Sequence, residues 1–469
     1  MQYLIFFAHV HEDFRLPELD ALAKLEGIDV DLSAYTNSSP FLVVDLPDEE
    51  TAKRLVKRAV LVRAIYELWG EAPTLEALHD VVKTRAAEYG WFEAYRTDTF
   101  KYEVEIFNHT RPVEEHVEMI NSFRFTGFEG RIRMKGAQQI YAIFEEWTKP
   151  KAGPHTIDPT HKLVRVFNGR LVSVGNREAI HMYDLKKRQY LGTTSMDAEL
   201  SLVSANMAHA TPGKLVYDPF VGTGSFLFTC GHYGAMTFGS DIDGRQIRGG
   251  GKKRAGGVLA NIKQYGLSSN FLDCCTYDIT HNPLRKGVRF DAIVCDPPYG
   301  VRAGAKKLGR KNDEELRTEP ILLRSGIYSH EQPDYHPPMR PYELSEVMVD
   351  LLGFSATRLN DGGRLVLWLP TVTDEYQDVD IPTHANMTLL YNSVQDFGKW
   401  ARRLLTYVRH VRKDGEGDGE EMGKEGVVTN GLKPAHADFR EKYFNRFRKD
   451  PEAGEVEEVA DRLKEETLN

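Results

Sequence analysis

The sequence predicts an α/β protein, in which an N-terminal ferredoxin-like α+β region precedes a Rossmann-like domain with a seven-stranded, mostly parallel sheet. In the second half of the chain, short apolar runs end abruptly in glycine, proline or aspartate, as buried parallel strands do. Several of these runs are followed at once by an acidic residue, at the strand end where open α/β sheets bind their ligands. The first 150 or so residues alternate strand and helix patterns in the order of a ferredoxin-like layer.

The N-terminal elements follow one another without long interruptions. Strands are expected at residues 3–8, 41–45, 60–69 and 101–107, and helices at 14–25, 49–58, 74–89 and 113–123. The helix at 14–25 rests on leucines at helical spacing, whereas the strands are short apolar runs. Basic residues then surround the glycines of residues 125–130, and further elements continue to about residue 147.

Composition fits a soluble globular protein of two or three domains, with 469 residues of which 41% are hydrophobic. The net charge is −9, but residues 413–469 hold 10 basic and 16 acidic residues and account for −6 of it. Residues 1–412 therefore carry only −3. A nearly neutral body with local basic loops is compatible with an enzyme that acts on nucleic acid.

The four cysteines form no Cys-x-x-Cys pair, so the sequence predicts no metal site and suggests buried thiols in a reducing compartment. No apolar stretch approaches the ~18 residues needed to span a bilayer. The N-terminus lacks the basic flank and cleavage site of a signal peptide. We therefore expect a cytoplasmic protein, with the nucleus as the alternative.

One motif predicts a site for an amine on a flat ring: Asp296, Pro297, Pro298 and Tyr299 follow the strand-like run 290–295. The two prolines fix φ and supply no N–H, so their carbonyls project from a stiff turn. The Asp296 carboxylate and the Pro297 carbonyl can together accept both hydrogens of a base amine. Tyr299 offers a ring face for stacking. The alternative is a strand that ends in a Pro-Pro turn beside a surface aromatic.

A second loop, after the apolar run 215–217, predicts a cofactor site. Its glycines permit backbone angles and close ligand approach, and its hydroxyls can bond near the start of the following helix. The loop lacks both the phosphate-loop pattern and the dinucleotide glycine pattern. An acid at the strand tip is also better suited to an amine cation than to a phosphate. The loop residues expected at the cofactor are Asp218, Pro219, Gly222, Thr223, Gly224 and Ser225.

The next two strands supply further acids. Asp241 follows the run 235–240, where such folds hydrogen-bond a ribose, and Ile242 offers an apolar face to an adenine ring. Asp278 follows the run 271–276, and its carboxylate could accept a hydrogen bond from an adenine amine. The alternative for Asp278 is an ordinary surface aspartate.

Two basic stretches flank these motifs. No acidic residue occurs between residues 244 and 272, and a second basic stretch follows the Asp-Pro-Pro-Tyr turn. Such runs are often solvated loops, but two of them at one rim favour nucleic acid. The basic residues expected to contact RNA are Arg124, Arg131, Arg133, Lys135, Arg245, Lys252, Lys253, Arg254, Arg302 and Lys306.

Together, residues 187–412 resemble the class I S-adenosylmethionine-dependent methyltransferases that methylate amines. The resemblance implies S-adenosyl-L-methionine as cofactor and the Asp-Pro-Pro-Tyr residues as the catalytic motif. It also places residues 190–199 over the methionine end of the cofactor, with Thr194, Ser195 and Met196 in contact. By itself this segment is only a capped helix start.

The whole chain is similar to RNA methyltransferases that carry a THUMP domain, which is a tRNA-binding module. Within that group it most resembles the catalytic subunits of eukaryotic tRNA (guanine-10-N2)-methyltransferases, on residues 190–200, 218–225, 296–300 and 439–444. The resemblance implies methyl transfer to the exocyclic N2 of a tRNA guanine, and a THUMP domain that holds the acceptor end. It further implies a heterodimer with a small zinc-binding activator protein that covers an apolar surface. Phe238, Phe271 and Leu272 could contribute to that surface, although ordinary core packing is the alternative.

The expected organisation has five parts. They are an N-terminal ferredoxin-like domain (1–72), a THUMP domain (73–155), a linker (156–186), a class I methyltransferase domain (187–412) and an acidic, partly flexible extension (413–469). The remaining strands of the sheet are expected at 363–369, 387–391 and 402–409, the last of them antiparallel. The insertion at 301–343 is expected to form a lid over the site; disorder is the alternative.

Two other functions were weighed against this one. A related enzyme could methylate another RNA guanine or adenine amine, a DNA adenine or a protein glutamine, but the N-terminal RNA module disfavours the last two. A non-catalytic tRNA-binding factor with a degenerate site would be expected to lack Asp218, Asp241 or Asp296, and all three are present.

Overall fold

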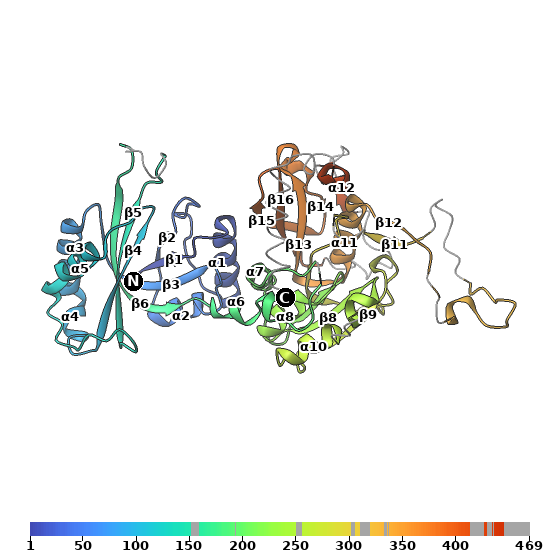
Figure 1. The fold of residues 1–469 in the computed structure, drawn as a ribbon, viewed down its shortest axis with the longest axis horizontal. Coiled ribbons are helices and arrows are strands. Elements are labelled where there is room, and N and C mark those ends of the chain that lie inside the picture. Colours follow the sequence, from blue (N-terminus) through green and yellow to red (C-terminus); the bar gives the residue numbers. More distant parts are fainter. Residues whose placement is uncertain are drawn as a thin grey trace. The chain divides into compact units, whose positions relative to one another are not determined.

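The computed structural model describes residues 1–151, 159–192, 194–249, 256–301, 305–309, 319–332, 335, 337–412, 426–428, 434 and 436–444. The chain forms two compact units, Met1–Ala179 and Ile180–Asn469 (Figure 1).

The N-terminal unit is built on one six-stranded sheet in the order β2-β1-β3-β6-β5-β4. Its strands are β1 (Gln2–Phe7), β2 (Phe41–Asp45), β3 (Val62–Ala72), β4 (Phe100–Phe107), β5 (Gln139–Trp147) and β6 (Leu163–Val174). Its helices are α1 (Glu12–Glu26), α2 (Glu49–Val56), α3 (Leu75–Tyr89), α4 (Trp91–Ala94) and α5 (Val113–Asn121), followed by the 3-10 helix η1 (Ser122–Thr126). β4 and β5 are parallel, and the other pairs are antiparallel.

The stretch 156–186 is not simply the linker that the sequence suggested, because it contains β6. This strand pairs with β3 on one side and with β5 on the other, and it joins both halves of the N-terminal unit in a single sheet. Its centre is Asn168-Gly169, a dipeptide that usually marks a turn. Here Asn168 is buried and donates to the Ala142 carbonyl at 3.1 Å. A Cβ at Gly169 would lie 2.6 Å from the Glu67 carbonyl oxygen, so the dipeptide permits a close approach of two strands.

The apolar run at residues 2–7 is continuous because both faces of β1 are covered. Tyr3, Ile5 and Phe7 join the core that includes α1 and α2, whereas Leu4 and Phe6 join a second core with residues of β5 and β6. A third core gathers α3, α4 and α5 around Trp69, which stacks on Trp91 at 5.1 Å between ring centroids. The strands and helices predicted for the first 150 residues are therefore confirmed, with ends that differ by a few residues.

The second unit holds a nine-stranded sheet in the order β17-β14-β15-β16-β13-β10-β7-β8-β9. Seven strands are long, as predicted: β7 (Leu215–Asp218), β8 (Met236–Asp241), β9 (Phe271–Thr276), β10 (Phe290–Cys295), β13 (Leu359–Val372), β15 (Met387–Asp396) and β16 (Trp400–Arg409). The other two, β14 (Thr383–His384) and β17 (Val427–Val428), are two residues each and extend one edge. The neighbouring strands β9, β8, β7, β10 and β13 are parallel to one another. β16 is antiparallel to both of its neighbours.

The helices of this unit lie before, between and after its parallel strands. They are α6 (Glu178–Met182), α7 (Ala198–Met207), α8 (Ser225–His232), α9 (Gly244–Arg248), α10 (Gly257–Gln264), α11 (Leu344–Arg358) and α12 (Phe439–Lys442). Short 3-10 helices are η2 (Leu185–Lys187), η3 (Ile279–His281), η4 (Ser329–Glu331), η5 (Thr373–Glu375) and η6 (Asp378–Asp380). Because β7, β8 and β10 are parallel and adjacent, the residues that follow them lie at one edge of the sheet.

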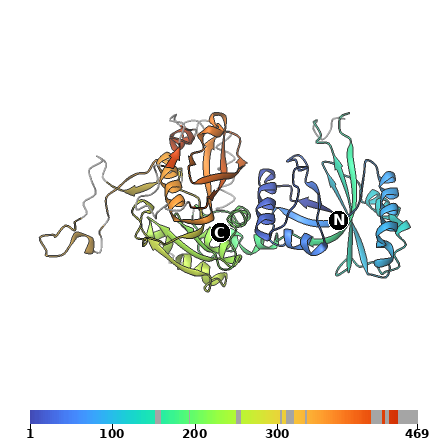
Figure 2. The same ribbon diagram turned by 180° about the vertical axis from the view of Figure 1, so that it is seen from behind.

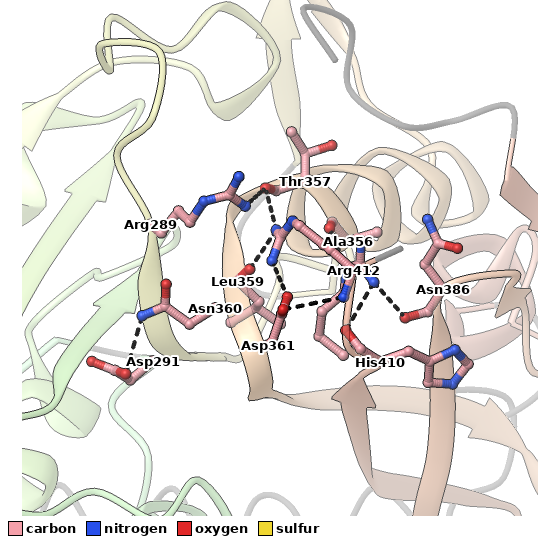
Figure 3. Close-up of polar contacts among 11 residues, drawn as sticks. Arg289, Asp291, Ala356, Thr357, Leu359, Asn360, Asp361, Asn386, His410 and Arg412 are labelled. Atoms are coloured by element: carbon pink, nitrogen blue, oxygen red, sulfur yellow. Dashed lines mark hydrogen bonds and ion pairs between the residues drawn. The ribbon is translucent and has the colours of Figure 1, made fainter. Parts of the chain in front are cut away.

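The C-terminus of α11 is held by arginines. Arg412 donates to the carbonyls of Thr357 and Leu359 at 3.1 and 2.7 Å and also pairs with Asp361, while Arg289 donates to the Thr357 carbonyl at 3.1 Å (Figure 3). Cations at this position satisfy the last carbonyls of a helix and complement its dipole. They fix α11 against β13 at the end of the sheet opposite the strand ends that carry the acids.

A two-stranded ribbon extends from this unit. β11 (Lys306–Leu308) and β12 (Met339–Pro341) are antiparallel, and both views show them leading away from the large sheet (Figures 1 and 2). Two contacts anchor the ribbon at its base. The Leu308 N–H donates to Asp278 Oδ2 at 2.7 Å, and Lys307 pairs with Glu346 of α11 at 2.9 Å.

All four cysteines are free. Cys230 and Cys295 are buried, whereas Cys274 and Cys275 on the edge strand β9 are partly exposed, so only two match the expectation of buried thiols. Among the described residues, no helix has the length and apolar character that crossing a membrane would require.

In the N-terminal unit, a buried carboxylate takes the place of a backbone acceptor for two N–H groups. Glu18 of α1 is buried and accepts hydrogen bonds from the backbone N–H groups of Val60 and Leu61 at 2.9 and 2.8 Å. We expect Glu18→Ala to lower the free energy of unfolding by about 1–3 kcal/mol, because two buried donors lose their acceptor. Urea denaturation would measure this, with the exposed Glu50→Ala as control, for which a change within about 0.5 kcal/mol is expected. Equal stability of the two variants would contradict the assigned role.

Candidate functional site

A cavity of about 880 Å³ opens at the carboxyl ends of β7, β8 and β10. It is lined by all four residues expected at the catalytic motif and by eleven of the twelve expected at the cofactor. The lining residues from these two groups are Asp296, Pro297, Pro298, Tyr299, Thr194, Ser195, Met196, Asp218, Pro219, Gly222, Thr223, Ser225, Asp241, Ile242 and Asp278. The local motifs therefore converge on one cavity, although they come from five separate segments.

Gly224 is the expected cofactor residue that does not line the cavity. It has φ of +90° and begins α8, and a Cβ there would lie 2.8 Å from the ring of Phe228. A glycine is needed here because the residue before the helix has a left-handed backbone conformation and packs closely against Phe228. The neighbouring Gly222, with φ of +48°, does line the cavity and donates its N–H to Asp241 Oδ2 at 2.9 Å.

The hydroxyls of this loop were expected to bond locally near the start of the helix, and both do so without capping it. The N-cap residue of α8 is Gly224, and no side chain caps it. Thr223 instead lies 2.8 Å from Ser195, oxygen to oxygen, and Ser225 donates to the Met196 carbonyl at 3.4 Å. These contacts fasten the segment 194–196 to the glycine loop, so that both form one wall of the cavity.

Three carboxylates stand at the ends of adjacent strands, where Asp218 is buried and Asp241 and Asp296 are partly buried. Asp218 accepts a hydrogen bond from the Phe220 N–H at 3.0 Å, and Asp241 accepts from Gly222 and Asp243 at 2.9 and 2.8 Å. Asp296 differs, because its buried Oδ1 has no hydrogen-bond partner among the described residues. Asp296 lines the cavity, so its carboxylate is a candidate acceptor for a ligand bound there.

Burial raises the pKa of all three acids. The pKa of Asp218 is raised well above its usual value by burial, and the charges of Asp241 and Asp296 raise it further. The pKa of Asp241 is also raised by burial, against the effect of its two backbone hydrogen bonds. Burial raises the pKa of Asp296 to about 6, and Arg402 is the neighbouring charge that lowers it. The cluster as a whole favours a cationic ligand.

Asp278 is buried rather than on the surface, but its carboxylate is already engaged. One oxygen accepts from the Thr280 N–H at 2.8 Å and the other from the Leu308 N–H at 2.7 Å. It lines the cavity and at the same time holds the base of the β11–β12 ribbon. Its structural role therefore goes beyond the adenine contact that the sequence suggested.

The C-terminal segment completes the wall around Tyr299. The Tyr299 ring meets Phe439 of α12 edge to face at 5.9 Å between centroids, and Phe439 in turn packs on Trp400 at 5.8 Å. Gly300 has φ of +85°, and a Cβ there would lie 3.1 Å from the side chain of Arg440. Residues 436–444 thus fix the orientation of Tyr299 beside the Pro-Pro turn. The rest of the expected extension lies largely outside the described residues.

Several lining residues were not expected from the sequence. Arg402 enters from β16, and Tyr335, Pro337, Met339 and Tyr342 come from the insertion at 301–343. These insertion residues line the cavity, and the lid expected of this segment stays a prediction. Arg402 lies in an ordinary strand pattern, and only the pairing of β16 beside β13 brings it to the site.

The basic residues expected at RNA fall into three groups. Arg245 and Lys306 line the cavity, and Arg245 pairs with Asp243 at 2.8 Å. Arg124, Arg131, Arg133 and Lys135 are exposed on the N-terminal unit, where residues 131–133 pair with Phe100 at the start of β4. Lys252, Lys253, Arg254 and Arg302 lie outside the described residues. Within the described part of the chain, no cluster of histidine, cysteine and acidic residues could hold a metal ion.

The fold and the cavity together define a class I S-adenosylmethionine-dependent methyltransferase. In the sheet, the neighbouring strands β9, β8, β7, β10 and β13 are parallel, and β16 beside β13 is antiparallel. Three acids lie at the ends of adjacent parallel strands. The cofactor carries a positive sulfonium and an ammonium group, which fit a cavity walled by buried carboxylates with raised pKa. Asp241 at the tip of the second strand fits a ribose, and the absence of a Cβ at Gly222 permits a ligand to approach closely.

Comparison with known proteins narrows this class. Residues 1–177 match the Tmrp11 THUMP N-terminal domain, and residues 186–316 match the RMKL-like methyltransferase domain. The chain is 43% identical to the tRNA (guanine(10)-N(2))-methyltransferase of Saccharomyces cerevisiae, over 95% of this chain and 99% of that protein. It is 35% identical to the Homo sapiens protein TRMT11 of the same name, over 96% of each chain. The crystal structure of TrmN from Thermus thermophilus aligns over 87% of this chain and 100% of that chain, with 16% identity and a TM-score of 0.44. The chain belongs to the tRNA (guanine(10)-N(2))-methyltransferase family.

The ionisation of Asp296 should cost the ligand-free protein stability. Its folded pKa of about 6 lies above the ~3.9 of an unfolded aspartate, so the folded state loses stability as pH rises from about 4 to above 6. We expect Asp296→Asn to raise the free energy of unfolding by about 1–3 kcal/mol at pH 8 and to change it little at pH 4. Chemical denaturation at several pH values would measure this difference. A variant that is less stable than the parent at both pH values would contradict the assignment.

Proposed function

We propose that this chain transfers a methyl group from S-adenosyl-L-methionine to the exocyclic N2 of guanine 10 of tRNA, as the catalytic subunit of a heterodimer with a small zinc-binding activator. The family supports the reaction and the substrate, because its relatives carry that name over nearly their whole length. The single structural observation that carries the proposal is the buried, unpartnered Oδ1 of Asp296 beside the Pro297-Pro298 turn.

The catalytic motif accounts for recognition of an amine. An exocyclic amine has two hydrogens, and Asp296 and the Pro297 carbonyl supply two acceptors at a turn without competing backbone donors. The lone pair of such an amine is delocalised into the ring, which makes the nitrogen a poor nucleophile. Hydrogen bonds to both hydrogens draw the nitrogen toward tetrahedral geometry and hold it in place for attack. Tyr299, braced by Phe439, fixes the plane of the ring.

Charge on the nitrogen is handled by the same carboxylate. S-adenosylmethionine, when bound, supplies an electrophilic methyl group on a positively charged sulfur. The ionised Asp296 stabilises the positive charge that develops on the amine nitrogen as it gains a fourth bond. Asp296 need not remove a proton beforehand, since the proton can leave after the transfer. The low polarity around Asp296 strengthens this interaction, because the group is buried.

The cofactor contacts follow from the same cavity. We assign the amine cation to Asp218, the ribose to Asp241, and the adenine ring to the side chain of Ile242. The segment 194–196 would lie over the methionine end, held by Thr223 and Ser225. Asp278 would face the adenine amine with the lone pairs that Thr280 and Leu308 leave unused.

For the tRNA, we assign the N-terminal unit as the acceptor-end binding module. The exposed basic residues around 124–135 of that unit support this assignment, and Lys306 at the cavity would serve the nucleotides near the target. For the activator, we assign the surface beside β9, the strand at one edge of the sheet. Leu272 of that strand is more than half exposed, whereas Phe238 stacks on Tyr217 and packs against the core.

Asp296 and Asp241 should separate catalysis from cofactor binding. We expect Asp296→Ala to abolish methyl transfer while leaving the affinity for S-adenosylmethionine nearly unchanged. Asp241→Ala should weaken cofactor binding by one to two orders of magnitude, in line with the roughly 1–3 kcal/mol of a charged hydrogen bond. Isothermal titration of both variants would test the division. An equal loss of cofactor affinity in the two would refute it.

The reaction itself can be tested with labelled cofactor and unmodified tRNA transcripts. We expect N2-methylguanosine at position 10, found by nucleoside mass spectrometry, only when the zinc-binding activator is co-expressed. A transcript with guanine 10 replaced by adenine is the matched control and should not be labelled. Labelling at another nucleotide would keep the chemistry and overturn the assigned position. Full activity without the activator would remove the heterodimer from the proposal.

A further inference from the structure

Arg188 is a buried arginine without a carboxylate partner, just before the segment that forms one wall of the cavity. The residue is only 6% exposed, and two of its nitrogens, Nε and Nη2, have no hydrogen-bond partner among the described residues. The third, Nη1, donates to the Ser225 hydroxyl at 2.8 Å. The guanidinium also lies over the Phe228 ring, 5.1 Å from its centroid. Burying a charge with so few partners costs free energy, which a bound anion would offset.

The backbone around Arg188 is fastened to α10. The Gln264 side chain accepts from the N–H of the residue after Arg188 at 2.9 Å and donates to the carbonyl of the residue before it at 2.6 Å. Asn261 exchanges two hydrogen bonds with the backbone of Tyr190, at 2.9 and 2.7 Å. The arginine is therefore held in place before a ligand binds, so that binding needs little further ordering of this segment.

Ser225 carries the effect of Arg188 to the cavity. It is the first residue of α8, and it lines the cavity. Because Arg188 donates to its oxygen, the hydroxyl hydrogen of Ser225 must point elsewhere. It is directed to the Met196 carbonyl at 3.4 Å, which is long for a hydrogen bond between two oxygens. A stronger acceptor in the cavity, such as a carboxylate, would take this hydrogen.

The start of α8 adds backbone donors at the same place. The helix has eight residues, its N-cap is Gly224, and no side chain caps it. The first N–H groups of a helix have no partner within it, and together with the helix dipole they favour an anion. The uncapped helix and the buried arginine are independent features, and both favour negative charge beside Ser225.

We propose that Arg188 is a positioning residue for the cofactor: through Ser225 it holds the carboxylate of the methionine end of S-adenosylmethionine at the start of α8. This inference rests on the proposed function, in which the segment 194–196 lies over the methionine end and Asp218 takes the amine cation. The ammonium and the carboxylate of that end then have separate partners. Arg188 does not touch the reacting atoms, so it determines the affinity for the cofactor and the choice between cofactors.

Arg402 is the alternative partner for this carboxylate. It lines the cavity, and its Nη1 lies 3.7 Å from the sulfur of Met196. Its Nε and Nη2 both donate to Gln395 Oε1, at 3.1 and 2.7 Å. Arg402 thus already has polar partners, whereas two nitrogens of Arg188 have none in the described part of the chain. The contacts therefore favour Arg188, and a variant of Arg402 belongs in the same experiment.

The test compares two ligands that differ only in the carboxylate, S-adenosylmethionine and decarboxylated S-adenosylmethionine, titrated calorimetrically into the full-length chain co-expressed with the activator. The parent protein should prefer the first ligand by about tenfold or more, the scale of a hydrogen bond to a charged group. In Arg188→Met this preference should fall by about tenfold, because only the affinity for the carboxylate-bearing ligand drops. Ser225→Ala should lower the same preference severalfold.

Two further substitutions are matched controls. Lys187→Met removes an exposed charge next to Arg188 in the sequence. Arg364→Met removes a buried guanidinium that donates to the Met207 carbonyl at 2.7 Å. Neither Lys187 nor Arg364 is a lining residue of the cavity, so both variants should keep the preference of the parent protein.

A purely structural role of Arg188 would give another pattern. If Arg188→Met lowers the affinity for both ligands by the same factor, the arginine only supports the cavity wall and the inference fails. It fails equally if Arg402→Met, and not Arg188→Met, removes the preference, or if the parent protein binds both ligands equally well. Should Arg188→Met not fold, Ser225→Ala decides, and an unchanged preference in that variant overturns the inference.

The outcome can be separated from failure of the proposed function. Asp241→Ala should lower the affinity for both ligands by the same factor, because the ribose is common to them. If the folded parent protein binds neither ligand, the assigned cofactor cavity is wrong. If Asp241→Ala behaves as expected and Arg188→Met keeps the preference, the cofactor cavity stands and only the inference about Arg188 is lost.

Discussion

The site depends on one constraint, which is the parallel pairing of β8, β7 and β10. This pairing brings Asp241, Asp218 and Asp296 to one edge of the sheet, where Asp218 is buried and the other two are partly buried. Buried carboxylates are costly unless something compensates them. Asp218 and Asp241 are compensated in part by backbone N–H groups of the loops that follow their strands, whereas Asp296 keeps an oxygen without a partner. These carboxylates would therefore be stabilised by a positive charge and by further hydrogen-bond donors. A sulfonium cofactor and an amine substrate can supply both.

The local motifs were predictable because each is a short segment in which the chemistry and the strand end coincide. Asp218, Asp241 and Asp296 could be placed from the sequence, since each directly follows an apolar run. Arg402 could not, because β16 runs antiparallel and reaches the site at its beginning, beside the end of β13. Its position depends on a pairing between residues more than thirty apart, which no local pattern encodes. The same holds for Phe439, which reaches Tyr299 from the far end of the chain.

In the N-terminal unit, a strand rather than a site residue was missed. Its strands and helices up to residue 147 were placed well, but the residues of β6 were assigned to a linker. In a hairpin a dipeptide such as Asn168-Gly169 supplies the turn; here it lies within a strand, where the absent Cβ lets two backbones approach. The burial of Asp278 could not be predicted from its neighbours in the sequence either. Nothing near it in the sequence indicates that Leu308, thirty residues away, will occupy its carboxylate.

The electrostatics of the cavity also bear on how a tRNA can be bound. Three acids at the strand ends attract a cationic cofactor, but they repel the phosphates that dominate affinity for nucleic acid. The lining also holds the basic residues Arg245, Arg248, Lys306 and Arg402, which are outnumbered by its five aspartates, and Arg245 is paired with Asp243. A cavity of this kind cannot hold an RNA by its own charge, so most of the binding energy must come from surfaces away from the catalytic turn. A separate unit with exposed arginines and a lysine at 124–135 meets that requirement, and this is the physical reason to assign tRNA binding to the first 179 residues and chemistry to the rest.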